Sequence, residues 1–384
     1  MIDTPKEFNL KLQQWHAINE RDLPWKSNAN AYKIWLSEII LQQTQVKQGT
    51  PYYLNFVKKY PDIQSFIKAD LDDILALWKG LGYYSRARNM YEAAQQINET
   101  FDGLFPNNYQ DILALKGVGK YTAAAIASFA YELPHAVVDG NVIRLITRYY
   151  GITGDYTRRA TMSKIESLAQ KLMDHAILPS SHNQAMMDFG ALQCKPSNPL
   201  CQSCPFSNQC VAYLNNQTDK IPFKTAKIKK TTRYFHYLVL MNHEGIILKQ
   251  RTNDDIWKGL FDLPMIESDS SKPPSEETFF SILPTLKIKK TCIERPIKRI
   301  LDTRKHILTH QIIFANYYEV SSTCDISQNE NFQYFKNLGT IGYPSLFSKF
   351  LKGQDLETLP TRKIDIRFLH NSLCTVNCLT KDTI

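Results

Sequence analysis

Four closely spaced cysteines constrain this chain more than any other feature. Cys194, Cys201, Cys204 and Cys210 follow the spacing C-x6-C-x2-C-x5-C. Four thiolates in so short a stretch can surround one metal centre, because each intervening loop is brief and its closure entropy is modest. Such a set suits either zinc or a [4Fe–4S] cluster. The spacing therefore predicts a metal site and leaves the metal open.

Composition and the absence of targeting signals narrow the class of protein. Residues 1–10 contain no apolar run of the signal-peptide type, and no stretch reaches the roughly 18 apolar residues that span a bilayer. We therefore expect a cytoplasmic protein, in which thiols stay reduced and metal binding is favoured over disulfides. The formal net charge of +9 favours nucleic acid as partner, although many soluble proteins are mildly basic. No amphipathic basic helix supports a membrane surface.

The pattern along the chain predicts more than one domain. Apolar periodicity, interrupted by short Gly- or Pro-containing loops, indicates successive helices, and residues 32–46 read as one of them. Later, residues 242–245 predict a hairpin turn and residues 310–320 a strand. The expected segments are a helical domain (1–215), a basic linker (216–233), a β-rich domain (234–360) and a tail (361–384).

A Gly-x-Gly motif precedes an alanine-rich helix predicted over residues 121–129. Gly117 and Gly119 permit a tight turn, and the free N–H groups of the following helix can bind phosphate oxygens. An ordinary helix–turn–helix elbow has the same pattern. Asp139 follows Gly119 by 20 residues (139 − 119 = 20) and stands before an apolar helix, where aspartate is a favoured N-cap.

Glu38 lies within the helix predicted over residues 32–46. Its neighbours at three and four residues are Ile34, Trp35, Leu41 and Gln42. A carboxyl group set mainly among apolar side chains is desolvated, which raises its pKa and keeps a proton available near neutrality. A general acid needs that property. A solvated glutamate on an otherwise buried helix is the alternative.

Three segments resemble one enzyme superfamily. The cysteine spacing resembles the cluster loop of the endonuclease III and MutY glycosylases, which holds [4Fe–4S]. LKGVGKYTAAAI followed by VDGNVIR resembles their helix-hairpin-helix and aspartate, and WLSEIILQQTQV resembles the MutY signature around its catalytic glutamate. The resemblance is strong over residues 23–210 and looser over 234–352. It implies an all-α helix-hairpin-helix core whose [4Fe–4S] cluster supports folding and DNA binding and does not excise the base.

The resemblance also implies an activity: monofunctional removal of adenine mispaired with 8-oxoguanine or guanine, in base excision repair of double-stranded DNA, by a monomer. Glu38 would protonate the extruded adenine, and anionic Asp139 would stabilise the oxocarbenium-like sugar. Tyr121 would support the intermediate and Asn141 would fix the carboxylate. Bifunctional relatives carry a nucleophilic lysine at the position of Tyr121. Lys120 stands one position too early, so the resemblance implies no strong strand cleavage.

Further positions match the family's DNA contacts. The target base must leave the stack before it reacts. Gln43 matches the wedge residue of the family and Tyr83 its intercalating tyrosine; surface or packing roles are the alternative. Gly117, Gly119 and Lys120 belong to the hairpin that grips the DNA backbone without reading sequence.

The C-terminal domain carries a weaker resemblance. Residues 257–261 (Trp-Lys-Gly-Leu-Phe) resemble the start of the C-terminal Nudix-like α+β domain of MutY. The glutamate run of a true Nudix hydrolase is missing after them, so a recognition module is implied. MutY relatives read 8-oxoguanine with a Phe-Ser-His turn, which corresponds here to Leu308, Thr309 and His310. The missing aromatic ring puts its stacking contribution in doubt, and strand-edge polar residues are the alternative.

Two other classes of protein fit part of this pattern. An endonuclease III-like or thymine-mismatch glycosylase would share the helical core, but Tyr121 and the second domain argue against the former, and LSEIILQQTQV argues against both. A non-catalytic DNA-binding protein with a structural four-cysteine metal site would make Glu38 and Asp139 incidental. Metal analysis and base release would separate these alternatives.

Overall fold

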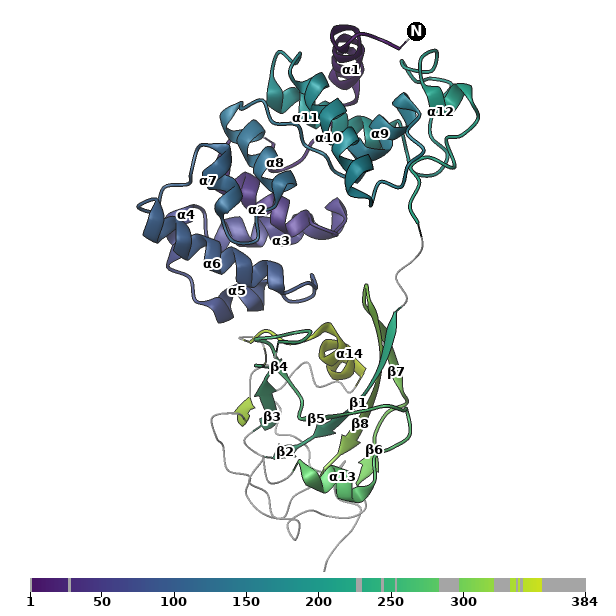
Figure 1. Cartoon of the computed structure of the whole chain (residues 1–384). Helices are drawn as coiled ribbons and strands as arrows, with labels where there is room; N and C mark the ends of the chain where they lie inside the picture. Colours follow the sequence, from purple (N-terminus) through teal and green to yellow (C-terminus); the bar gives the residue numbers. More distant parts are fainter. Residues whose placement is uncertain are drawn as a thin grey trace, which may run out of the picture. The chain divides into compact units, whose positions relative to one another are not determined.

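The computed structural model describes residues 2–26, 29–225, 230–242, 245–252, 254–282, 297–320, 332–335, 338 and 341–353. The chain splits into two compact units, Met1–Ile228 and Lys229–Ile384 (Figure 1). The predicted tail and the other four cysteines (Cys292, Cys324, Cys374 and Cys378) lie outside the described residues. None of the helices in the described ranges is long and apolar enough to cross a membrane.

Unit 1 consists of helices. They are α1 (Pro5–Asn19), α2 (Ala31–Leu41), α3 (Val46–Lys59), α4 (Ile63–Ile67), α5 (Leu71–Leu77), α6 (Ser85–Thr100), α7 (Tyr109–Ala114), α8 (Lys120–Tyr131), α9 (Gly140–Tyr150), α10 (Arg159–Met173), α11 (Pro179–Leu192) and α12 (Val211–Leu214). Four alanines of α8, residues 123, 124, 125 and 127, are buried, and these small side chains let α2 and α11 pack closely against it. Phe8, Val142, Ile146 and Phe189 join α1, α9 and α11 in one core. The predicted all-helical region is confirmed.

The prediction of one helix over residues 32–46 was wrong. Helix α2 ends at Leu41, and α3 begins at Val46. Between them Gln43 has a φ of 54°, which no helix contains. The carbonyl groups of Ile39 and Ile40 near the end of α2 accept hydrogen bonds from the guanidinium of Arg86 on α6, so a distant residue caps the helix.

Helices α7 and α8 form the predicted helix-hairpin-helix. The Val118 N–H donates to the Leu115 carbonyl at 3.1 Å, which closes the turn. Gly117 has a φ of 75°, and a Cβ there would lie 2.6 Å from Cβ of Asn89. Only glycine fits this position without strain. Gly119 is the N-cap of α8, which starts one residue before the predicted Tyr121.

The predicted linker over residues 216–233 was wrong at both ends. Ile221 is buried, and its carbonyl accepts a 2.8 Å hydrogen bond from Nε of Arg148, while the Phe223 carbonyl accepts one from the Tyr156 N–H. Residues 216–225 therefore belong to unit 1. Strand β1 starts at Thr231, where pairing with the first residues of β8 orders the chain.

Unit 2 contains two sheets. The first has the order β5-β1-β8-β6, with β7 paired to β8; the second has the order β2-β3-β4, with β9 paired to β3. Strands β1 and β8 are parallel, and the other pairs are antiparallel, including the predicted hairpin of β2 and β3. The bounds are β1 (Thr231–Val239), β2 (Met241–Asn242), β3 (Gly245–Gln250), β4 (Phe261–Asp262), β5 (Met265–Ser268), α13 (Glu276–Ser281), β6 (Lys298–Arg299), β7 (Arg304–Ile307), β8 (Gln311–Glu319), β9 (Phe332–Phe335) and α14 (Ser345–Gly353). These mixed sheets confirm the α+β class, and the Nudix-like identity stays a prediction.

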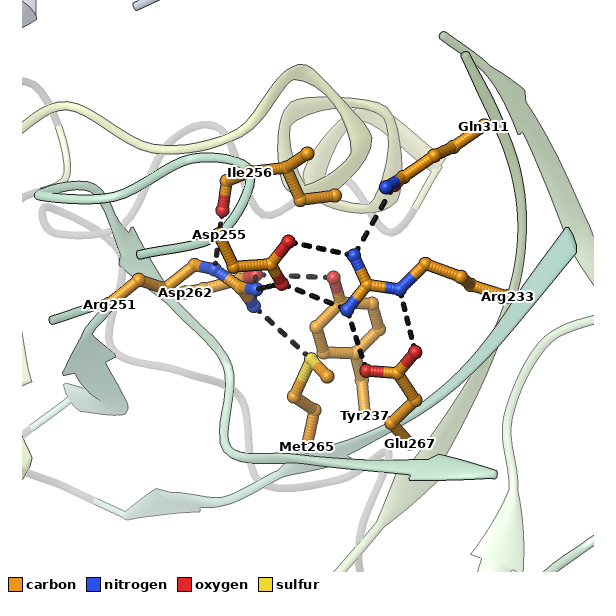
Figure 2. A network of polar contacts seen from close by, with 9 residues as sticks. All are labelled: Arg233, Tyr237, Arg251, Asp255, Ile256, Asp262, Met265, Glu267 and Gln311. Carbon is orange, nitrogen blue, oxygen red and sulfur yellow. Dashed lines mark hydrogen bonds and ion pairs between the residues drawn. The ribbon is translucent and has the colours of Figure 1, made fainter. Parts of the chain in front are cut away.

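A polar network ties the strands of unit 2 together. Figure 2 shows Arg233 of β1 between the carboxylates of Asp255 and Glu267, with bonds of 2.6–2.9 Å. Arg233 also contacts the side chain of Gln311, the first residue of β8, at 3.3 Å. Asp262, buried behind this layer, has its pKa raised to about 7 by burial, against the charge of Arg251. The network holds the base of the β7–β8 turn in place.

Candidate active site

Glu38 is a buried carboxyl group in the middle of α2. Its side chain accepts a 2.6 Å hydrogen bond from the Tyr121 hydroxyl of α8. Burial raises the pKa of Glu38 to about 7; the bond from Tyr121 opposes this rise, and the charge of Asp139 adds to it. The group therefore holds a proton in a substantial fraction of molecules at neutral pH, as a general acid must. The desolvation expected from the apolar neighbours is confirmed.

Asp139 is the N-cap of α9. One oxygen accepts from the Val142 N–H at 2.8 Å, and the other accepts from Nδ2 of Asn141 at 2.7 Å. Burial raises the pKa of Asp139, and these hydrogen bonds together with the charge of Arg144 oppose that rise. Nη2 of Arg144 in turn donates to Oδ1 of Asn141 at 2.8 Å, which fixes the amide. Both carboxylate oxygens are thus held in one orientation.

One pocket of unit 1 brings these groups together. Glu38, Tyr121, Asp139 and Asn141 all line it. Since α2, α8 and α9 each contribute, the site depends on helices distant in sequence. The negative charge of Asp139 raises the pKa of Glu38, so the ionisation of one carboxyl group affects that of the other. The arrangement can deliver a proton on one side of a ligand and stabilise positive charge with the second carboxylate.

A charged cluster that was not among the predicted site residues forms another part of the pocket wall. Asp188 of α11 is fully buried and accepts from Nε of Arg21 at 2.6 Å, from Nζ of Lys26 at 3.2 Å and from Nε2 of His16 at 3.2 Å. Burial disfavours its ionised form, but the bond from His16 and the charges of Arg21 and Lys26 prevail and lower its pKa. Two basic residues around a Pro-Trp pair were the available signal.

The predicted wedge and intercalating residues lie outside the set that lines this pocket. Gln43 is exposed in the turn after α2. Tyr83 is exposed, by 44%, in the loop before α6. Both have positive φ values, 54° and 49°.

The hairpin residues are accessible. Gly117, Gly119 and Lys120 are exposed in the turn and at the start of α8. Nζ of Lys120 lies 3.6 Å from the Glu166 carboxylate, an exposed ion pair of small energetic value. Its side chain does not line the pocket.

The predicted recognition turn joins β7 to β8. Thr309 and His310 are exposed there. Leu308 is half-buried and packs against the core of unit 2, and its N–H donates to the Gln311 carbonyl at 2.9 Å. The residue that replaces an aromatic ring is therefore turned toward the core.

The four predicted metal ligands line a second pocket of unit 1. Nη1 of Arg148 lies 3.5 Å from Sγ of Cys194. Burial raises the pKa of Cys204 to about 12, and the other three cysteines act in the same direction. Four half-buried sulfurs that disfavour one another's charge fit a multivalent cation, which would be held by thiolates. In the described ranges, however, no three His, Cys, Asp or Glu side chains already have the arrangement of metal ligands.

Comparison with known proteins bears on this site. A family model described as "HhH-GPD superfamily base excision DNA repair protein" matches residues 36–171, which include Glu38, Tyr121 and Asp139. The adenine DNA glycosylase of Buchnera aphidicola subsp. Baizongia pistaciae is 38% identical over 350 residues, covering 88% of this chain and 94% of that protein. The chain belongs to the adenine DNA glycosylase family.

Other members of the glycosylase superfamily match a smaller share of the chain. The human adenine DNA glycosylase is 40% identical over 214 residues, 53% of this chain and 39% of that one. The solved structure of a thermostable thymine-DNA glycosylase, 31% identical, superposes with a TM-score of 0.51 over 55% of this chain and 97% of that one. The likeness to the Buchnera adenine DNA glycosylase extends into unit 2, because 88% of the chain exceeds unit 1.

Proposed function

We propose that this chain is a monofunctional DNA glycosylase that removes adenine mispaired with 8-oxoguanine or guanine from duplex DNA. Membership of the adenine DNA glycosylase family supports the base that is removed. One observation carries the mechanism: Glu38, with a pKa of about 7, shares a pocket with Asp139, whose two oxygens accept hydrogen bonds. One carboxyl group is suited to give a proton and the other to remain anionic.

The proposed reaction is an acid-assisted hydrolysis. Glu38 donates its proton to N7 of the extruded adenine, so that the bond between the sugar and N9 breaks with both electrons going to the base. The carboxylate of Asp139 stabilises the resulting oxocarbenium-like sugar. Water, activated by a carboxylate, then adds to the sugar carbon. The products are free adenine and an abasic site.

The amines near the site support a monofunctional enzyme. The phenol of Tyr121 occupies the position of a family lyase lysine and donates to Glu38. Lys120 is exposed and pairs with Glu166. Lys26 lines the pocket, but its Nζ is bound to Asp188 and to the Arg21 carbonyl. Borohydride treatment during turnover should trap no covalent enzyme–DNA adduct at the level that a lyase gives.

Two further parts of the chain support DNA recognition. The amides of the α7–α8 hairpin would bind the phosphate backbone. The exposed Thr309 and His310 would contact the lesion opposite the adenine, with unit 2 as a Nudix-like recognition module. Leu308, which packs on the core, would add no stacking, so we expect modest discrimination between 8-oxoguanine and guanine.

The cofactor and the state of assembly complete the proposal. Cys194, Cys201, Cys204 and Cys210 would hold a [4Fe–4S] cluster, as is typical of endonuclease III-like glycosylases. When bound, the cluster would stabilise the fold and the DNA-binding surface without taking part in base excision. The enzyme would act on double-stranded DNA as a monomer.

Base release from defined duplexes tests the proposed function. The substrates carry A opposite 8-oxoguanine, G, C or T, and T opposite G; the enzymes are wild type, Glu38→Gln and Asp139→Asn. We expect adenine release from the first two duplexes only, and a loss of at least about 100-fold in Glu38→Gln. Thymine release from the T·G duplex would favour the thymine-specific alternative. DNA binding with no release of any base would favour a non-catalytic protein.

A further inference from the structure

Among the exposed residues of unit 1 with a positive φ, a conformation that L-amino acids seldom adopt, two lie next to α2 and α6. Gln43 follows α2 and Tyr83 precedes α6, with φ values of 54° and 49°. Neither is a glycine, asparagine or aspartate, the residue types that tolerate this region best. Such conformations persist only where the surroundings fix them, and they cluster at functional sites. Some group must therefore hold both loops.

The guanidinium of Arg86 binds both loops at once. Its Nη1 donates to the carbonyl oxygens of Ile39 at 2.7 Å, Ile40 at 3.0 Å and Gln42 at 2.7 Å. Its Nη2 donates to the carbonyl oxygen of Gly82 at 3.2 Å. Gln42 and Gly82 are the residues directly before Gln43 and Tyr83. The peptide groups that lead into the two strained residues thus share one cation.

The surroundings of Arg86 fit a fixed anchor. Arg86 is only 9% exposed, and its guanidinium lies 4.9 Å from the ring centre of Trp78 and 5.7 Å from that of Tyr83. Nε1 of Trp78 also donates to the Gly82 carbonyl, at 3.0 Å. The carbonyl groups at the end of α2 carry the negative end of the helix dipole, which a cation complements. Planar guanidinium geometry is needed to reach these acceptors together, and a lysine ammonium would reach fewer.

We propose that Arg86 is a positioning residue that holds Gln43 and Tyr83 as one rigid pair for insertion into the DNA stack. This inference rests on the proposed function. Arg86 binds the carbonyl groups directly after Glu38 in α2. The same contacts therefore also fix the position of the pair relative to Glu38, the proposed acid. The residues that extrude the base and the residue that protonates it would then be held at fixed positions relative to one another.

A fluorescence experiment with Arg86→Lys tests the inference apart from the chemistry. 2-Aminopurine, placed beside the target adenine in the duplex, reports unstacking when wild type or variant is added in excess. We expect the extruded fraction to fall about tenfold, the scale of one hydrogen bond to a charged group. The pH dependence of adenine release should keep its shape, because Arg86 does not touch the carboxyl groups of the pocket.

A double-variant comparison separates a positioning role from general damage. With Gln43→Ala and Tyr83→Ala already present, Arg86→Lys should reduce extrusion less than twofold, because nothing remains to position. Ile97→Ala, which opens a cavity in the core face of the same helix, is the control for lost stability and should leave extrusion within twofold of wild type. A tenfold loss that persists in the alanine background, or one equalled by Ile97→Ala, overturns the inference.

A second measurement applies if Arg86→Lys does not fold. Gln43→Ala and Tyr83→Ala, singly and together, should be non-additive by more than threefold in extrusion, as residues of one fixed pair are. Additive losses overturn the inference. Failure of the proposed function looks different: wild type would then unstack the duplex, with the same dependence on Arg86, but release no adenine.

Discussion

The hydrogen bond between Tyr121 and Glu38 makes a specific prediction about pH. The hydroxyl lies 2.6 Å from Oε2 and stabilises the ionised carboxylate, so it opposes the effect of burial on the pKa of Glu38. Tyr121→Phe removes this donor and keeps the ring. The pKa of Glu38 should therefore rise above its present value of about 7.

The size of the rise follows from the contact. A hydrogen bond to a charged group contributes about 1.5–3 kcal/mol, and about 1.4 kcal/mol corresponds to one pKa unit. Part of this is offset, because the protonated carboxyl group can also bond to the phenol. We expect a rise of about one unit. Since the acid works only while protonated, the alkaline limb of the pH–rate profile should move up by the same amount.

Single-turnover release of adenine between about pH 5 and 10 measures this limb. Tyr131→Phe is a matched control, because its hydroxyl bonds to the Phe105 carbonyl and not to Glu38. The plateau rate of Tyr121→Phe should also fall if the phenol supports the intermediate, and this change is separate from the shift of the limb. An alkaline limb that stays in place or moves to lower pH would refute the assignment of Glu38 as the acid.

Three further predictions concern the scaffold. Gly117→Ala places a Cβ 2.6 Å from Cβ of Asn89 at a φ of 75° and should cost about 1–3 kcal/mol in urea unfolding. Asp188→Asn leaves Arg21 without its charged, buried partner and should lower the free energy of unfolding by about 3–5 kcal/mol at pH 7. Because the pKa of Asp188 is lowered in the folded state, the difference in stability between wild type and variant should shrink as the pH falls below about 4. Cys204→Ser should lower bound iron and thermal stability together, as measured by metal analysis and calorimetry.

Local patterns in the sequence were sufficient for several parts of the fold. Helix α8 extends over the predicted residues because a glycine N-cap and a run of alanines are local signals. Asp139 was recognised as a helix N-cap from its own neighbours. At Glu38 the apolar residues one turn away predicted desolvation but left a solvated glutamate open, and the role of acid came from the resemblance. For the two helix features the deciding interactions span only a few residues.

Features created by distant residues could not be predicted in this way. The carbonyl groups at the end of α2 are bound by Arg86, more than forty residues later. Residues 216–225 read as a polar linker, yet Ile221 is buried and bonded to Arg148. Likewise, Asp188 gathers His16, Arg21 and Lys26 from the other end of unit 1. Local sequence patterns do not indicate such contacts between distant residues.

The contrast between the two carboxyl groups follows from where each lies on its helix. In the middle of α2, every nearby N–H group is already used by the helix, so the hydroxyl of Tyr121 is the hydrogen-bond donor that the structure gives Glu38. Asp139, as the N-cap of α9, accepts from the free Val142 N–H and faces the positive end of the helix dipole. Burial raises the pKa of both groups; at Glu38 the hydrogen bond from Tyr121 opposes this rise, whereas at Asp139 several hydrogen bonds and the charge of Arg144 oppose it. A proton is therefore kept more readily on Glu38, and a negative charge on Asp139, in the same pocket.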